Sequence, residues 1–146
     1  MSYQVPVVRI QLVRENSLTC ESKSIQSPFD AVEIMRPIMD GLDREAVYVM
    51  LLNTKNMALG INMVSMGDIS SSIVHPREVF KAAILANAAG IVMFHNHPSG
   101  DTKPSLDDEV VSKRIYAAGE IIGISLLDHI IIGANNHTSL KDLGII

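Results

Sequence analysis

Short apolar runs, rich in β-branched residues and bounded by polar or turn-forming residues, predict strands in five places along the chain. These runs are residues 5–13, 45–52, 57–65, 91–94 and 121–132. The second and third are joined by Asn53-Thr54-Lys55-Asn56, whose residue types favour a β-hairpin turn. Asp128-His129 interrupts the last run, and the polar stretch 14–27 is interpreted as a loop.

Apolar residues spaced three and four positions apart predict three helices among these strands. Ser27-Pro28 suits the start of the first helix, which Pro37 is expected to bend or shorten. A second helix begins at residues 75–78, and a third runs from about Ser105 to Ala118. The tail 138–143 is expected to hold a final helical turn. This interleaving predicts an α/β or α+β fold with one central mixed sheet flanked by helices.

Composition narrows the class of protein. With 146 residues, the chain is interpreted as one domain, 1–146, in which 1–27 forms an N-terminal extension. No apolar run reaches the roughly 18 residues of a membrane span, and the first residues do not resemble a secretory signal. The single cysteine, Cys20, predicts a reducing, cytoplasmic location. The net charge of −4 disfavours general binding to nucleic acid.

One short stretch carries the candidate chemistry. His95 and His97 stand two positions apart at the end of a predicted strand, so both side chains point to the same face. Ser105 and Asp108 follow at the start of a predicted helix. Catalytic zinc takes three protein ligands, commonly imidazoles and a carboxylate, and keeps a further position for water. The spacing therefore predicts a zinc site made by His95, His97 and Asp108.

Simpler interpretations exist for parts of this stretch. Ser105 and Asp108 also fit a capping box, in which each side chain bonds the backbone of the other at a helix N-terminus. A cap does not explain the two histidines upstream, and Ser105 can serve both purposes. The letters His95-Asn96-His97 invite comparison with HNH nucleases, in which the three residues are scattered along the motif. A base deaminase is disfavoured because its signature needs cysteines that this chain lacks.

The histidine stretch lies among further recognisable motifs. HNHPSGDTKPSLDD is preceded by HPREVFKAAILANAAGIVMF and followed by GISLLDHIIIG. Together they resemble the RadC-type branch of the JAB/MPN (JAMM) metalloprotease-like domains, over about residues 40–146. The resemblance implies a layering of sheet and helices like that of cytidine deaminases. It also implies zinc bound by His95, His97 and Asp108, Ser105 stabilising a tetrahedral intermediate, and an upstream glutamate activating the water.

Two glutamates compete for this last role. The family pattern places its glutamate on the first core strand, well before the two histidines. Glu45, at the head of a predicted strand, fits that position and is the preferred candidate, although exposure at a strand edge is its simpler interpretation. Glu78 lies at the start of a predicted helix, where the helix dipole alone favours an acidic residue.

The function that follows is a zinc-dependent metallohydrolase that cleaves a peptide, isopeptide or other amide bond. The alternative is a catalytically silent metal-binding or scaffold module of a DNA-repair-associated protein. The negative charge and the absence of an obvious helical segment in residues 1–27 disfavour direct DNA binding. Asp128 and His129 are expected to support the metal ligands, because burying either without partners is costly; an exposed strand end is the alternative.

Overall fold

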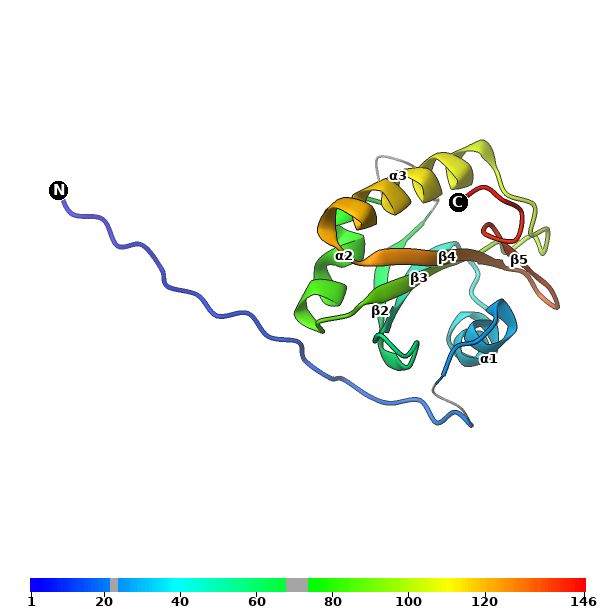
Figure 1. Ribbon diagram of the computed structural model, residues 1–146, viewed down its shortest axis with the longest axis horizontal. Helices are drawn as coiled ribbons and strands as arrows, with labels where there is room; N and C mark the ends of the chain where they lie inside the picture. Colours follow the sequence, from blue (N-terminus) through cyan, green and yellow to red (C-terminus); the bar gives the residue numbers. More distant parts are fainter. Residues whose placement is uncertain (22–23, 68–73) are drawn as a thin grey trace.

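The computed structural model describes residues 1–21, 24–67 and 74–146, and within these ranges the chain forms three helices and five strands (Figure 1). In chain order these are α1 (Pro28–Met39), β1 (Ala46–Leu52), β2 (Ala58–Met66), α2 (Pro76–Leu85), β3 (Gly90–Asn96), α3 (Leu106–Ile122), β4 (Ser125–Ile132) and β5 (His137–Ser139). The strands form one mixed sheet in the order β2-β1-β3-β4-β5. β3 and β4 are parallel, and α3 provides the crossover between them.

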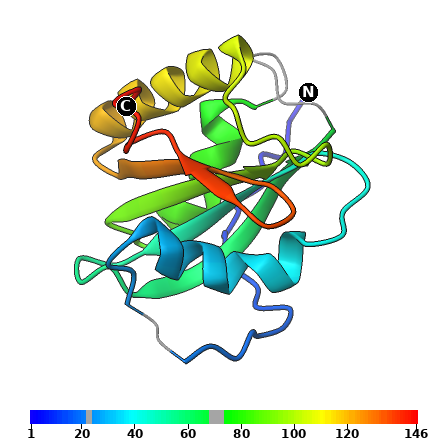
Figure 2. The same cartoon turned by 90° about the vertical axis from the view of Figure 1, so that its right-hand side faces the viewer.

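Helices cover both faces of the sheet, as the two views show (Figures 1 and 2). α2 and α3 lie over a core that includes Phe80, Met93 and Ile115, whereas α1 lies over the opposite core with Met35 and Phe94. The arrangement confirms the predicted α+β class with a central mixed sheet flanked by helices. Antiparallel pairing of β1 with β2 confirms the predicted hairpin. Within the described ranges, none of the helices is long and apolar enough to cross a membrane.

β3 separates the two cores residue by residue. Its side chains Ile91 and Met93 belong to the core under α2 and α3, whereas Val92 and Phe94 belong to the core under α1. All residues of the strand are buried, which explains why residues 91–94 are continuously apolar instead of alternating. His95 continues the series of Ile91 and Met93, so the strand directs its imidazole to the side on which α3 lies.

α3 carries a buried stripe that contains two polar residues. The buried positions are Asp108, Val111, Ser112, Ile115 and Gly119. They recur every three or four residues, which is the spacing of one helix face. Gly119 allows the helix to approach the next segment closely, because a Cβ at this position would lie 2.5 Å from the Ile124 carbonyl oxygen. The stripe brings Asp108 and Ser112 into the interior.

α1 begins at the predicted cap. Ser27 accepts a hydrogen bond from the Asp30 backbone N–H, the Asp30 carboxylate accepts one from the Ser27 N–H, and Pro28 is the first helical residue. Pro37 lies in the last turn, and the helix ends shortly after it, at Met39.

The prediction of a strand at residues 5–13 is wrong. Residues 1–21 have no regular secondary structure and are exposed throughout, and the N-terminal end of this segment extends away from the folded part of the chain (Figure 1). Val7, for example, has a relative exposure of 101%. A β-branched sequence becomes a strand where neighbours pack and pair with it, and the first bridge to the sheet comes only at Ser24, opposite Met57.

The predicted boundary between the third helix and the last long strand is also wrong. α3 continues past Ala118 to Ile122, and β4 begins at Ser125 instead of Ile121. The helix ends at Gly123, whose φ of 85° is the left-handed conformation typical of a helix C-terminus. Ile121 is 88% exposed, so its apolar character does not mark a buried strand.

In the tail, the predicted helical turn is preceded by a strand. Residues 137–139 form β5, which pairs antiparallel with β4. One helix-like turn follows, in which the Leu143 N–H donates to the Ser139 carbonyl. The pairing with β4 explains the difference, because it satisfies the backbone of residues that would otherwise begin the turn.

Candidate metal centre

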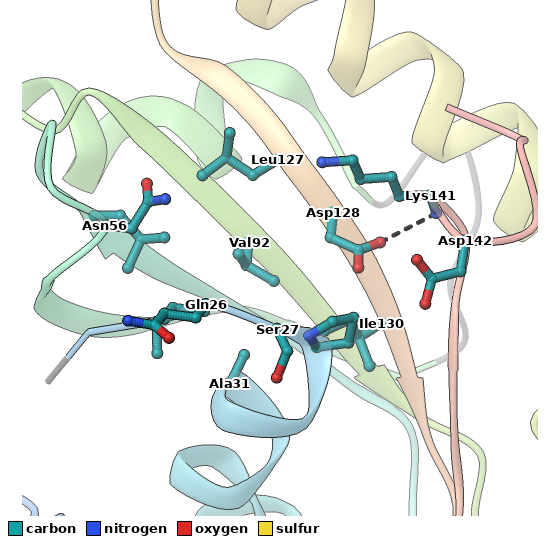
Figure 3. A pocket seen from close by; sticks show the side chains of 13 residues that line it. Gln26, Ser27, Ala31, Asn56, Val92, Leu127, Asp128, Ile130, Lys141 and Asp142 are labelled. Carbon is teal, nitrogen blue, oxygen red and sulfur yellow. Dashed lines mark hydrogen bonds between the residues drawn. The ribbon is translucent and has the colours of Figure 1, made fainter. Parts of the chain in front are cut away.

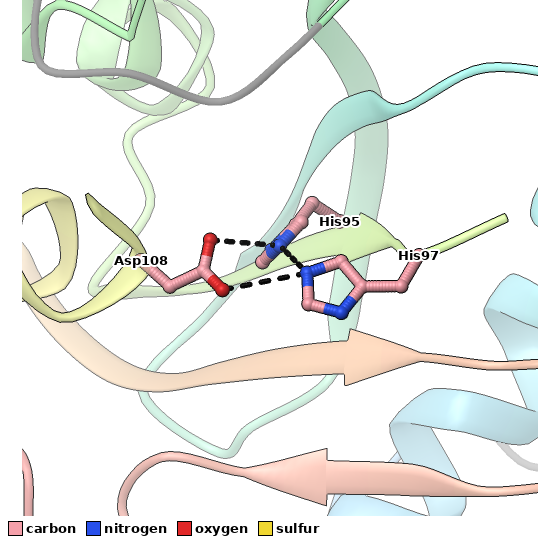
Figure 4. Close-up of side chains that lie close together, drawn as sticks. All are labelled: His95, His97 and Asp108. Atoms are coloured by element: carbon pink, nitrogen blue, oxygen red, sulfur yellow. Dashed lines mark hydrogen bonds and ion pairs between the residues drawn. The ribbon is translucent and has the colours of Figure 1, made fainter. Parts of the chain in front are cut away.

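The end of β3 presents two imidazoles on one face of the sheet (Figure 4). His95 lies within the strand, and His97 is the first residue after the strand end. The backbone N–H of His97 is still bonded to the Ile132 carbonyl of β4. The extended backbone therefore continues through His97, and the two side chains point the same way. Their Nε2 atoms lie 2.8 Å apart.

Asp108 reaches the histidines from the first turn of α3. Ser105 is the N-cap: its hydroxyl accepts from the Asp108 N–H at 3.1 Å, and Asp108 Oδ2 accepts from the Ser105 N–H at 2.7 Å. Asp108 Oδ1 lies 3.1 Å from His95 Nε2, and Oδ2 lies 3.4 Å from His97 Nε2. The capping interpretation is thus confirmed, and the same cap aims the carboxylate at the imidazoles, as the ligand interpretation requires.

The three side chains fit a bound cation. Asp108 Oδ1 is buried and accepts no hydrogen bond from any described residue, although His95 Nε2 is near it. A buried carboxylate oxygen left without a partner is costly unless something else satisfies it. His95, His97 and Asp108 each offer one ligand atom, all within 4.8 Å of one another. Two imidazole nitrogens and a carboxylate oxygen are a donor set that zinc accepts.

Charge in the site favours the ionised carboxylate. Burial opposes ionisation of Asp108, but the two adjacent imidazoles of His95 and His97 and the hydrogen bond from the Ser105 N–H outweigh it and hold the pKa of the carboxyl well below its usual range. The same contact with Asp108 raises the pKa of His97 above its ordinary value. Asp108 is therefore an anion at neutral pH, as a metal ligand must be.

A backbone carbonyl fixes the tautomer of His97. Its Nδ1 lies 2.6 Å from the Asp101 carbonyl oxygen. Since a carbonyl oxygen only accepts hydrogen bonds, the ring proton is on Nδ1 and the lone pair of Nε2 faces the carboxylate. Histidine ligands of metals commonly make a bond of this kind with their second nitrogen.

The loop that supplies this carbonyl is packed tightly against the β4–β5 hairpin. Gly100, with a φ of 88°, closes a turn in which its N–H donates to the His97 carbonyl. Thr102 is buried and accepts a hydrogen bond from the Thr138 hydroxyl at 2.7 Å. At Gly133 a Cβ would lie 2.7 Å from the Gly100 carbonyl oxygen, so only glycine leaves room for the loop.

Glu45 stands beside His97 at the entry to β1. β1 and β3 pair antiparallel with Val47 opposite His95, so continuing this register places Glu45 opposite His97. The negative charge of Glu45 contributes to raising the pKa of His97, as expected of neighbouring groups. Glu45 is half-buried at this position.

Asn96, between the two histidines, holds the backbone on both sides of Glu45. Its side-chain oxygen accepts from the Ala46 N–H at 2.8 Å, and its side-chain amide donates to the Arg44 carbonyl at 2.9 Å. Asn96 is 4% exposed, so these bonds are shielded from water. The residue that separates the two candidate ligand histidines thus fixes the backbone on both sides of the candidate base.

Glu78 lies apart from this group. It is in the first turn of α2, where it forms an ion pair with Lys81 at 2.9 Å. The hydrogen bond and charge of Lys81 lower the pKa of Glu78, which is exposed. Its side chain borders a depression with β2 residues instead of the histidines. The geometry favours Glu45 over Glu78.

Of the Asp128-His129 pair, only His129 comes to the metal centre. β4 contains one extra residue at this point: Ile91 pairs with Leu126, but the next β3 residue, Val92, pairs with Asp128. After this bulge His129 faces α3, with its Nε2 2.8 Å from His95 Nδ1. Both its ring nitrogens are engaged, since Nδ1 contacts the Ser112 hydroxyl.

Asp128 lines a pocket on the opposite face, beside α1 and the C-terminal segment (Figure 3). Its carboxylate accepts hydrogen bonds from the Ser139 hydroxyl at 2.6 Å and from the backbone N–H groups of His129 and Lys141. Burial raises the pKa of Asp128 even though these bonds oppose the shift. Its contacts tie β4 to the C-terminal turn.

Comparison with known proteins identifies the family. Residues 25–145 match the family described as the RadC-like JAB domain. The chain belongs to this family. A UPF0758 protein of Desulforamulus reducens is 52% identical over 122 residues, which cover 84% of this chain and 54% of that protein. A UPF0758 protein of Listeria monocytogenes is 46% identical over 137 residues, covering 92% of this chain and 61% of that protein.

The family match and these relatives confirm the resemblance to the RadC-type branch. They do not extend it to an activity. A UPF0758 protein of Clostridium acetobutylicum is 48% identical over 126 residues, 86% of this chain but 55% of that protein. This RadC-like chain thus spans little more than half the length of the curated relatives it matches. The relatives' names state no activity, so catalysis is a matter for proposal.

Two residues of the site were missed in the sequence. Nothing in the local sequence pattern around Asn96 indicates its bonds to Arg44 and Ala46. Ser112 carried a usable signal: it lies four residues after Asp108, on the same helix face, in an otherwise apolar stripe with Ile115. A polar residue in such a stripe is expected to have a buried partner.

Proposed function

We propose that this chain is a zinc-dependent metallohydrolase of the JAMM type, which cleaves a peptide, isopeptide or other amide bond with an activated water. The observation that carries the proposal is the buried Asp108 Oδ1, which lacks a hydrogen bond and lies 3.1 Å from His95 Nε2, in a carboxylate whose other oxygen lies 3.4 Å from His97 Nε2. A structural capping aspartate does not need a histidine at each of its carboxylate oxygens. A cytoplasmic location and an amide-containing substrate are parts of the same proposal.

The chain's own residues divide the chemistry between them. Bound zinc lowers the pKa of a water molecule and polarises a carbonyl group. Glu45, beside His97, accepts a proton from the attacking water and returns it to the leaving amine. The Ser105 hydroxyl uses its oxygen to accept the Asp108 N–H, which leaves its proton free to donate to the developing oxyanion. His95, His97 and Asp108 hold the metal.

The first prediction separates metal binding from turnover. His97→Ala should abolish stoichiometric zinc in elemental analysis, whereas Glu45→Gln should keep the zinc and lose hydrolysis. Removing a general base typically lowers the rate by about 10²–10⁴-fold. The substrates are a panel of peptides with α-linked and lysine ε-linked amide bonds, followed by release of the amine from the zinc-loaded full chain.

Glu78→Gln and His137→Ala are the matched controls, because neither residue lies in the group of His95, His97 and Asp108. Both should keep zinc and activity. Zinc binding without hydrolysis in the wild type would favour the silent metal-binding module. A wild-type chain that takes up no zinc at neutral pH would contradict both interpretations.

A further inference from the structure

A buried chain of hydrogen-bonding groups runs from His95 away from the ligand atoms and back to Asp108. His95 Nδ1 lies 2.8 Å from His129 Nε2, and His129 Nδ1 contacts the Ser112 hydroxyl. Ser112 Oγ in turn lies 2.7 Å from the Asp108 carbonyl oxygen. All four residues are fully buried. Two of the proposed zinc ligands are thus joined through two residues whose side chains are not ligands.

The protons of this chain follow from its fixed end. A carbonyl oxygen can only accept, so Ser112 donates its hydroxyl proton to Asp108, as serines in helices often do to the residue four before. The Ser112 oxygen then accepts from His129, which places the His129 proton on Nδ1. A neutral imidazole has one N–H, so His129 Nε2 accepts, and the donor to it is His95 Nδ1.

We infer that Ser112 and His129 are positioning residues that hold His95 in the tautomer with its proton on Nδ1. In this tautomer the lone pair of His95 is on Nε2, the atom that faces His97 and Asp108. His97 obtains the same result from the Asp101 carbonyl. For His95 the acceptor at Nδ1 is not a carbonyl but His129 Nε2. His129 can accept at Nε2 only while another group holds the His129 proton on Nδ1. Ser112 is that group.

The opposite direction of the same chain is the competing arrangement. Ser112 then donates to His129 Nδ1, and both imidazoles carry their protons on Nε2. The His95 proton would stand between His97 and Asp108 and would exclude a metal. The 2.8 Å contact between His95 Nε2 and His97 Nε2 favours this arrangement in the metal-free chain, because the His97 proton is on Nδ1. Two contacts oppose it: Asp108 Oδ1 receives no hydrogen bond from His95 at 3.1 Å, and the Ser112 hydroxyl lies in bonding position to the Asp108 carbonyl.

Nitrogen-15 NMR of the labelled full-length chain reads these tautomers directly. The expected result is that His95 and His129 both carry their protons on Nδ1, in the metal-free chain and after addition of zinc. A metal-free chain in which His95 carries its proton on Nε2 would overturn the inference. This readout does not depend on catalysis, nor on whether any variant folds.

The variants test the same assignment through metal affinity, and here the inference rests on the proposed zinc site. Ser112→Ala removes the acceptor of the His129 proton, and the zinc dissociation constant, measured by competition with a chelator, should rise by about tenfold or more. Ser112→Thr keeps a hydroxyl and should restore most of the affinity. Ser139→Ala is the control, since its buried hydroxyl bonds Asp128 on the other face.

Thermal unfolding of each variant shows whether it is folded before affinity is compared. A folded Ser112→Ala chain that binds zinc as tightly as the wild type, with an unchanged His95 tautomer, would overturn the inference. A wild-type chain that binds no zinc would instead remove the proposed function. In that case the tautomers of the metal-free chain still decide between the two directions of hydrogen bonding.

Discussion

Asp108 uses the two oxygens of one carboxylate for two purposes. Oδ2 completes the capping box with Ser105, and Oδ1 is held, without a hydrogen bond, beside His95. The cap does not compete with the site, because the hydrogen bond from the Ser105 N–H to Oδ2 also fixes the rotation of the carboxylate. Asn96 also serves two partners at the end of β3, where its one side-chain amide bonds backbone groups on both sides of Glu45.

A second prediction concerns Asn96. Asn96→Ala leaves the buried Ala46 N–H and the Arg44 carbonyl without their partner, and the free energy of unfolding should fall by about 1–3 kcal/mol, as for other unsatisfied buried groups. Urea denaturation measures this. Because the entry to β1 is loosened, hydrolysis by the zinc-loaded variant should fall more than its zinc content does.

Asn62→Ala is the matched control, since Asn62 is exposed on β2 and its loss should change stability by less than about 0.5 kcal/mol. An Asn96→Ala chain as stable as this control would show that the amide bonds of Asn96 do not hold the entry to β1.

Single irregularities in the elements decide which side chains reach the metal centre. The bulge in β4 turns His129 toward α3 and Asp128 toward α1. If the same sequence paired with β3 in a regular register from Leu126 onward, Asp128 and His129 would exchange faces, because side chains alternate along a strand. The turn after His97 has a similar role, since it returns the Asp101 carbonyl to the imidazole.

The third prediction follows from the packing of that turn on the β4–β5 hairpin. At Gly133→Ala the new Cβ would lie 2.7 Å from the Gly100 carbonyl and 2.8 Å from Thr102 Cγ2, so the loop must move. Overpacking of this kind costs about 1–3 kcal/mol of stability. Zinc affinity should also fall, because the displaced loop carries the carbonyl that orients His97.

Gly60→Ala is the control for this substitution. A Cβ there meets Leu51 Cδ1 at 3.8 Å, an ordinary contact. Both variants are compared by thermal unfolding and by chelator competition for zinc. If Gly133→Ala retained the affinity of Gly60→Ala, the loop would not be needed to hold His97.

At the scale of the whole molecule, the folded part begins near Ser24 and matches the family region, residues 25–145. The metal centre lies where β1, β3 and α3 meet, so its residues come from across this whole region. Residues 1–21 contribute no regular element and stay exposed. The prediction that 1–146 form a single domain with an N-terminal extension is therefore open to a direct test.

Removal of residues 1–21 tests this prediction. Because all of these residues are exposed, the free energy of unfolding of the truncated chain should differ from that of the full chain by less than about 0.5 kcal/mol. The truncated chain should also bind zinc equally well. Urea denaturation and chelator competition measure the two quantities. A clearly larger loss of stability would show that the segment docks on the folded part in solution.

Local sequence was sufficient for those features that depend on near neighbours. The helix starts at Ser27 and Ser105, the β1–β2 hairpin and the shared face of His95 and His97 follow from caps, turns and strand alternation. Local sequence was not sufficient where contacts with residues distant in the chain decide whether a segment forms a strand. Residues 5–13 have the composition of a strand but no pairing, and Ile121 is apolar but exposed.

By itself, the sequence determined which three side chains form the candidate metal centre, because the spacing of His95, His97 and Asp108 fixes their places on one strand end and one helix start. Only the tertiary structure decided what surrounds them. Glu45 comes to His97 through pairing of β1 with β3, and the bulge in β4 selects His129. These choices depend on register between strands distant in the chain, which no local pattern of residues specifies.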